Sequence, residues 1–171
     1  MNEALREKEK GNQYFKAGKF KESIVCYSKA IFVCDMQEVK QLSVFYSNRA
    51  FAKSKQQRYL SAIDDATQSF MLDNKYCKPL YHRYTARLAL GHLNEALVDI
   101  TAVCILEKQM VKEHVAARNE LLLDLSAMKT KEFTRELPKV RVNDSAIKQC
   151  FKQFKNHALF DESYDAEKIA A

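Results

Sequence analysis

An internal repeat constrains this chain more than any other feature of its sequence. Three stretches, beginning at Gly11, Ala50 and Tyr84, align with one another at nearly equal intervals along the chain. The first interval is the longer one, and removing five residues from the connection CDMQEVK makes the two intervals equal. Such a repeat predicts a stack of similar helix hairpins, with small side chains where two helices cross closely. Small residues do recur in one register: Ser23, Ala62 and Ala96.

The interval from Ala50 to Tyr84 is the period that is typical of the tetratricopeptide repeat, in which each repeat is one helix hairpin. We therefore expect an all-α fold in which the repeats 4–37, 43–76 and 77–110 form a right-handed superhelix. The chain has only three glycines and two prolines, which leaves little turn chemistry for an all-β fold. Gly18 and Gly91 fall at the expected turns of the first and third hairpins, and Gln56-Gln57 occupies this place in the second.

The residues after the third repeat predict a capping helix, a linker and a short final helix. Residues 111–128 have helical apolar spacing, and such a helix commonly covers the exposed apolar end of an array. Residues 4–128 then form one repeat domain. One face of the predicted capping helix would carry these apolar residues: Val115, Leu121, Leu122 and Leu125.

Residues 129–143 contain Pro138 and alternating charges, so they predict a linker. Residues 144–171 predict a short helix, to about residue 157, and an acidic tail. Residues 129–157 carry eight basic and three acidic residues, which we interpret as a solvent-facing basic arm. The short helix would present one apolar face: Ile147, Cys150, Phe151 and Phe154.

The motifs of enzymes and metal sites are missing from the sequence. It contains no glycine-rich phosphate loop, no HExxH and no GxSxG, its four histidines are far apart, and its five cysteines form no CxxC. We expect no catalytic residue, no metal and no cofactor. No apolar run is long enough to cross a bilayer, so we expect no membrane span in this chain. The aromatic residues fit a repeat core and groove wall better than a nucleic-acid surface. These observations favour a protein-binding domain over an enzyme or a nucleic-acid-binding protein.

The first helices of the repeats, here called the A helices, would line the concave face of such a superhelix. Lys8 and Asn12 are four residues apart and share one helix face. Asn48 holds the corresponding face of the second A helix, and Lys78 begins the third. Converging ammonium and amide groups suit a carboxylate. Spacing alone leaves open whether they form a site or an ordinary polar surface.

The segments EKEKGNQYFKAGKF, FYSNRA and NKYCKPLYHR resemble the carboxylate-clamp tetratricopeptide domains of heat-shock co-chaperones. The resemblance implies a clamp that grips the C-terminal carboxylate and acidic side chain of a Glu-Glu-Val-Asp tail on cytosolic heat-shock chaperones. Its members here would be Lys8, Asn12, Asn48 and Lys78, with His82 where the family has arginine. We further expect these residues to line the groove: Phe15, Arg49, Phe51 and Arg83.

The segments DITAVCILE and RELPKVRVNDSAIKQCFKQF resemble one branch of this family, the tetratricopeptide import receptors of the mitochondrial outer membrane. This resemblance implies that mitochondrial precursor proteins are further partners. It also implies a cytosol-facing place at that membrane, as part of a longer protein. The alternative is a scaffold that binds an internal segment of some partner, without chaperones.

His82 changes the expected strength of the clamp. An unperturbed histidine is mostly neutral at cytosolic pH, whereas arginine stays charged. We therefore expect weak tail binding that strengthens as the pH falls toward 6, and we expect His82→Arg to restore affinity at neutral pH.

Overall fold

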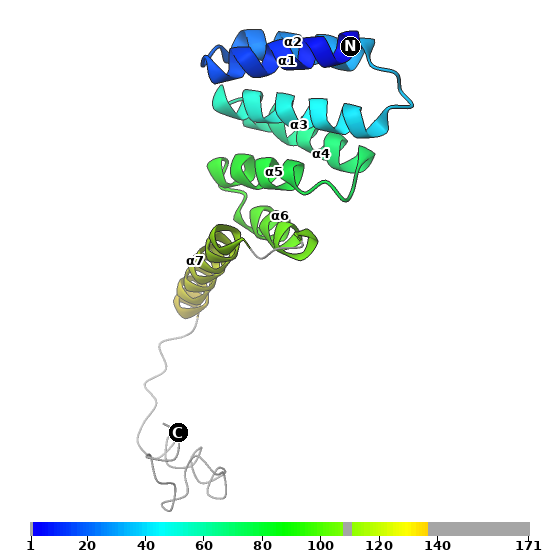
Figure 1. The fold of residues 1–171 in the computed structure, drawn as a ribbon. Helices are drawn as coiled ribbons and strands as arrows, with labels where there is room; N and C mark the ends of the chain where they lie inside the picture. Colours follow the sequence, from blue (N-terminus) through cyan, green and yellow to red (C-terminus); the bar gives the residue numbers. More distant parts are fainter. Residues whose placement is uncertain (1, 108–110, 137–171) are drawn as a thin grey trace, which may run out of the picture. The chain divides into compact units, whose positions relative to one another are not determined.

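A computed structural model describes residues 2–107 and 111–136 of the chain, and all regular secondary structure in these ranges is α-helical. The first six helices form three hairpins that stack in chain order (Figure 1). The predicted all-α array of three helix hairpins is confirmed. The helices are α1 (Glu3–Lys16), α2 (Phe20–Val33), α3 (Val39–Lys55), α4 (Tyr59–Leu72), α5 (Lys78–Ala89), α6 (Leu93–Leu106) and α7 (Lys112–Glu136).

Residues 1–130 form one compact unit, which contains the three hairpins and most of α7. Of the second unit, residues 131–171, the structure describes only the end of α7. Neighbouring helices pack in pairs within the first unit: α1 on α2, α3 on α4, and α5 on α6. The A helices are therefore α1, α3 and α5.

The three hairpin turns share one backbone conformation. Gly18 and Gly91 have φ angles of 72° and 75°, and Gln57 has a φ of 60°. Glycine adopts this left-handed region without cost, whereas a residue with a Cβ atom is strained there by about 1–2 kcal/mol. The predicted turns are confirmed, and the second hairpin makes its turn with a residue poorly suited to it.

Gly11 of α1 packs directly against the Tyr27 ring of α2. A methyl group at this position would lie 2.6 Å from Cε1 of the Tyr27 ring, which is far inside van der Waals contact. The small residues that share a register in the other hairpins, Ala50, Ala62 and Ala96, are also buried. The aligned small residues of the sequence therefore mark the helix crossings, as predicted.

The middle of α7 covers the end of the third hairpin. Leu121 and Leu125 are buried in one apolar cluster with residues of α5 and α6, among them Leu80 and Ile100. The predicted capping helix is present, but Leu122 does not share its buried side. The Leu122 side chain is 52% exposed because it lies about 100° around the helix from Leu121.

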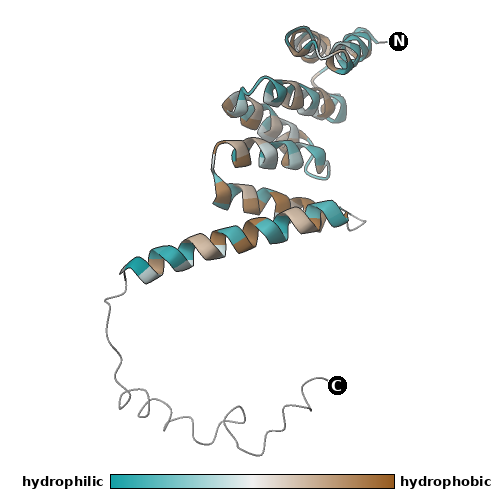
Figure 2. Ribbon diagram, turned by 90° about the vertical axis from the view of Figure 1, so that its left-hand side faces the viewer, coloured by the Kyte–Doolittle hydropathy of each residue, from teal (hydrophilic) through white to brown (hydrophobic). Residues whose placement is uncertain are grey.

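The helix α7 is longer than the sequence pattern predicts. It continues to Glu136, so residues 129–136 are helical where the pattern predicts a linker. This segment contains no glycine or proline, and its charges and apolar residues are all compatible with a helix, as the alternating colours along α7 in Figure 2 illustrate. The rest of the expected linker, the short helix with its apolar face, and the acidic tail lie outside the described residues.

Candidate functional site

Two adjoining hollows run along the A helices. The first, called the α1–α3 hollow, has a volume of about 240 Å³. The second, called the α5–α7 hollow, has a volume of about 480 Å³. Asn48 and Phe51 line both, so the two hollows form one continuous groove. The α1–α3 hollow is also lined by Asn12, Phe15, Lys16 and Tyr27. The α5–α7 hollow is also lined by Cys77, Lys78, Tyr81, His82, Val103, Glu107 and His114.

Aromatic rings connect the two hollows. The Phe15 and Phe51 ring centroids are 4.8 Å apart, and Phe51 stacks on the His82 imidazole at 4.6 Å with an interplanar angle of 16°. These rings come from α1, α3 and α5, respectively. Phe15 and Phe51, which the sequence predicts to line the groove, thus form one wall with the His82 ring across all three A helices.

Asn12 has its amide held in one orientation. Tyr27 Oη donates a 2.8 Å hydrogen bond to Asn12 Oδ1, which leaves Nδ2 as the outward-facing donor. Burial raises the pKa of the Tyr27 phenol, so this hydroxyl keeps its proton. Asn12 therefore offers an oriented N–H donor to anything that lies in the α1–α3 hollow.

Lys8 and Asn12 already hold a carboxylate in this structure, and it is that of Glu9. Lys8 Nζ lies 3.3 Å from Glu9 Oε2, and Asn12 Nδ2 donates to the same oxygen at 3.2 Å. The Glu9 side chain is 59% exposed, so water or a ligand can replace it. Lys8 does not line either hollow in this arrangement, because its ammonium group is turned toward Glu9.

Lys78 and His82 lie one turn apart at the start of α5, and both line the α5–α7 hollow. Pro79 lies in the first turn of this helix, where its missing N–H costs no hydrogen bond. Burial, and then the positive charge of Lys78, lower the pKa of His82 to about 4. His82 is consequently neutral at pH 6 as well as at pH 7. The expectation that tail binding strengthens toward pH 6 assumes an ordinary histidine pKa, which His82 does not have in the unbound chain.

Arg49 does not line the groove, contrary to the expectation from the sequence. Its Nε and Nη2 atoms each donate a 2.8 Å hydrogen bond to Asp65 of α4, and Nη1 donates to Ser28 of α2 at 3.1 Å. Lys53 Nζ lies 2.7 Å from the same Asp65 carboxylate. The guanidinium group is therefore engaged between helices rather than presented to a ligand.

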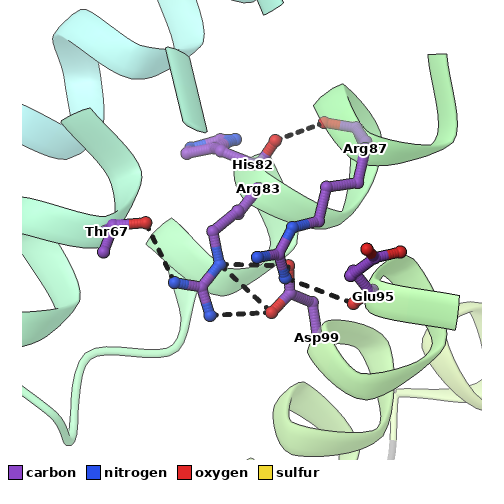
Figure 3. A network of polar contacts seen from close by, with 7 residues as sticks. Thr67, His82, Arg83, Arg87, Glu95 and Asp99 are labelled. Atoms are coloured by element: carbon purple, nitrogen blue, oxygen red, sulfur yellow. Dashed lines mark hydrogen bonds and ion pairs between the residues drawn. The ribbon is translucent and has the colours of Figure 1, made fainter. Parts of the chain in front are cut away.

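Arg83 repeats this arrangement one hairpin later, as Figure 3 shows. Its Nη2 donates to Asp99 at 2.7 Å, and its Nη1 donates to Thr67 at 3.0 Å. Arg87 supplies a second cation, because its Nη1 atom lies 2.6 Å from the Asp99 carboxylate. Asp99 itself is only 1% exposed. Each arginine thus joins the second helix of its own hairpin to that of the preceding one, and the expectation that Arg83 lines the groove is also wrong.

Sequence reasoning missed several groove residues and this ion-pair motif. The ion-pair motif is visible in the sequence as a repeat. Arg49 and Arg83 occupy equivalent positions of consecutive repeats, and so do Asp65 and Asp99. Lys16 had a weaker signal, four residues after Asn12 on the same helix face. Two further missed residues lie where the repeat pattern gives no guidance: Glu107 at the C-terminal end of α6 and His114 in α7.

In the part of the chain that the structure describes, no group of three or more His, Cys, Asp or Glu side chains could hold a metal ion. Within the same residues, no helix is both long and apolar enough to cross a membrane.

No family model matches the chain. The mitochondrial import receptor subunit TOM70 of Homo sapiens is 34% identical to it over 168 residues, which is 98% of this chain and 28% of TOM70. The chain therefore spans little more than a quarter of that relative's length.

Two solved structures extend the comparison. The first tetratricopeptide (TPR) domain of Spaghetti (RPAP3), bound to the HSP90 peptide SRMEEVD, is 33% identical, with a TM-score of 0.65 over 72% of this chain and 96% of that one. The second TPR domain of human RPAP3, in complex with the HSP70 peptide SGPTIEEVD, is 37% identical, with a TM-score of 0.62 over 70% and 94%. Together with the three hairpins, these similarities show that the chain belongs to the tetratricopeptide-repeat family and is homologous to the TPR clamp region of TOM70.

Proposed function

We propose that this chain is a protein-binding domain that captures the free, acidic C-terminal tails of heat-shock chaperones. The observation that carries the proposal is the carboxylate of Glu9, held jointly by Lys8 and the oriented amide of Asn12. Polar groups that already coordinate one carboxylate are suited to exchange it for another. The two related RPAP3 domains are bound to peptides that end in Glu-Glu-Val-Asp, which supports the same ligand class here.

Each clamp residue has a distinct role in this proposal. The C-terminal carboxylate of the tail takes the place of Glu9 between Lys8 and Asn12. Asn48, which lines both hollows, donates to it from the opposite helix. Lys78 supplies the charge for the last acidic side chain. His82 contributes a stacked ring and a hydrogen bond without a charge, so this clamp has two cations, where an arginine at position 82 would give it three.

A place in mitochondrial import is the finer part of the proposal. It is supported by the homology to TOM70, which is an import receptor subunit. In this proposal the chain belongs to a longer protein at the mitochondrial outer membrane, faces the cytosol, and receives chaperones that deliver precursor proteins. Imaging of the tagged full-length protein with an outer-membrane marker tests the location, and a diffuse cytosolic signal would contradict it.

Calorimetry with a Glu-Glu-Val-Asp peptide tests tail capture. We expect binding that disappears when the peptide's C-terminus is amidated, because the clamp recognises that charge. Lys8→Ala and Asn12→Ala should each weaken binding by about tenfold or more, in line with the loss of a charge-assisted hydrogen bond. Lys21→Ala, at an exposed position of α2, is the matched control and should bind like the wild type.

The same experiment distinguishes the alternative of an internal-segment scaffold. An amidated peptide that binds as well as the free acid would contradict the clamp and favour the scaffold. His82→Arg should tighten binding of the free acid at pH 7, since arginine adds a charged, forked donor. An unchanged affinity would show that position 82 does not contact the tail.

A further inference from the structure

The groove is lined by both positive and negative charges. Lys16 and the amide of Asn12 line the α1–α3 hollow, and Lys78 lines the α5–α7 hollow. Glu107, which also lines the α5–α7 hollow, is the only acidic residue among the described residues that line the two hollows. A ligand that binds its C-terminal carboxylate in one hollow and a basic side chain in the other would match this distribution.

Glu107 is built into the hollow rather than free in solvent. Its side chain is 15% exposed, and its Oε2 atom lies 2.8 Å from Nδ1 of His114. The Oε1 atom is not used in that contact and can accept from a second donor. The His114 ring in turn packs against Tyr81, with the centroids 4.6 Å apart. Aromatic faces beside a carboxylate suit a guanidinium group, which stacks on rings while it donates hydrogen bonds in its plane.

The length of an extended tail fits a path across the groove. The axes of packed helices lie about 8–10 Å apart, so a ligand that crosses two such spacings follows a path of about 20 Å. Five residues of extended chain span at most about 17–18 Å. An arginine side chain supplies several ångströms more. A basic residue about five positions before the last residue is therefore within reach of Glu107.

We propose that Glu107 makes the α5–α7 hollow a selectivity site for tails that carry an arginine or lysine about five residues before their C-terminal residue. The inference rests on the proposed function, because it requires the tail to be anchored by its carboxylate. It distinguishes the two tail types seen on the relatives. The HSP90 peptide SRMEEVD has arginine at that position, whereas the HSP70 peptide SGPTIEEVD has threonine. The chain should prefer the first type.

Calorimetric titration of SRMEEVD and SAMEEVD tests this selectivity. We expect the wild-type chain to bind SRMEEVD about fivefold or more tightly, and Glu107→Gln to bind the two peptides equally. Glu113→Gln removes an exposed charge from the first turn of α7 and should keep the wild-type ratio. His114→Gln removes the existing partner of Glu107, keeps the carboxylate, and should also keep a preference for SRMEEVD.

A charge exchange gives the decisive outcome. Glu107→Lys should reverse the preference and bind SEMEEVD more tightly than SRMEEVD. If Glu107→Gln retains the wild-type ratio, the arginine is recognised elsewhere and the inference is overturned. If the wild type requires a free C-terminal carboxylate but binds SRMEEVD and SAMEEVD equally, only the inference about Glu107 fails. If SRMEEVD and its amidated form bind equally, the proposed function itself fails.

Discussion

Tyr27 Oη donates a 2.8 Å hydrogen bond to Asn12 Oδ1, and this contact joins α2 to the polar wall of the groove. It makes Tyr27, a residue that is only 2% exposed, a positioning residue for the clamp. We predict that Tyr27→Phe weakens tail binding about fivefold, because the amide of Asn12 loses its fixed orientation, a loss of about 1 kcal/mol. Calorimetry with a Glu-Glu-Val-Asp peptide measures the effect.

Tyr14→Phe is the matched control for this prediction. Tyr14 lies on α1 and is 39% exposed, so loss of its hydroxyl should leave the affinity unchanged. A purely structural role for Tyr27 would lower the melting temperature without changing the affinity of the folded protein, and that result would contradict a positioning role.

In the proposed clamp, Glu9 competes with the tail for Lys8 and Asn12. We predict that Glu9→Ala tightens binding of a free-acid peptide by about two- to fivefold, since an exposed ion pair contributes about 0.2–1 kcal/mol. Glu22→Ala removes an exposed carboxylate from α2 and should have little effect, which separates local competition from a change in net charge. Weaker binding by Glu9→Ala would mean that Glu9 supports the clamp rather than blocks it.

His82 should make the stability of the array depend on pH. Its pKa is about 4 in the folded chain, because of burial and of the neighbouring Lys78, and an unfolded histidine has a pKa near 6.5. Between these values the unfolded state binds the proton more readily, so stability is lost as the pH falls from about 6.5 toward 4. The loss should approach about 1 kcal/mol per pH unit within this window.

Urea denaturation at several pH values checks the His82 prediction. His82→Gln keeps a polar side chain without a titrating ring, and carboxylates contribute equally to both proteins. The difference between wild type and His82→Gln should therefore shrink as the pH falls. Parallel curves for the two proteins would show that His82 is protonated as easily in the folded state as in the unfolded state.

Asp99 should be the most sensitive ion-pair residue. It is 1% exposed and pairs with both Arg83 and Arg87. We predict that Asp99→Ala destabilises the fold by about 3–5 kcal/mol, because two cations lose their buried counter-charge. The melting temperature should fall by roughly 10 °C. Asp64→Ala, at an exposed position of α4, serves as the control, and a similar shift in both variants would argue against the buried network.

Gln57 offers a stabilising substitution. Its φ of 60° places it in the left-handed region, where Gly18 and Gly91 lie in the equivalent turns. We predict that Gln57→Gly raises the free energy of unfolding by about 0.5–1 kcal/mol, as relief of the Cβ strain exceeds the greater flexibility of glycine in the unfolded chain. Gln56 has a φ of −89°, so Gln56→Gly should not stabilise the protein. Equal stabilisation by both would contradict a conformational cause.

The repeat fold was predictable because its signals are local and periodic. Gly18, Gly91 and Pro79 mark turns and a helix start by their own backbone chemistry, and small residues one repeat apart mark the crossings. The directions of side chains were less predictable. Arg49 and Arg83 lie on A helices, but each pairs with a buried aspartate on the second helix of its hairpin.

The candidate site was predictable in part for a similar reason. Asn12, Asn48, Lys78 and His82 line the groove as their helix positions suggest. The contacts of Lys8 with Glu9 and of Glu107 with His114 depend on side-chain torsions, which a repeat pattern does not encode. Burial of His82 against Phe51 is a tertiary effect, and it changes the protonation expected from the residue type alone.

The ion-pair motif also affects how an acidic ligand would approach. Each cluster holds two cations and one carboxylate, Arg49 and Lys53 with Asp65 in one, and Arg83 and Arg87 with Asp99 in the other. The first cluster therefore leaves one uncompensated positive charge on α3, which also carries Asn48, and the second leaves one on α5, which also carries His82. These fixed charges create a positive potential that reaches about 8 Å at physiological salt, beyond any hydrogen bond. The arginines that hold the hairpins together would thus also steer an acidic ligand toward the groove before contact.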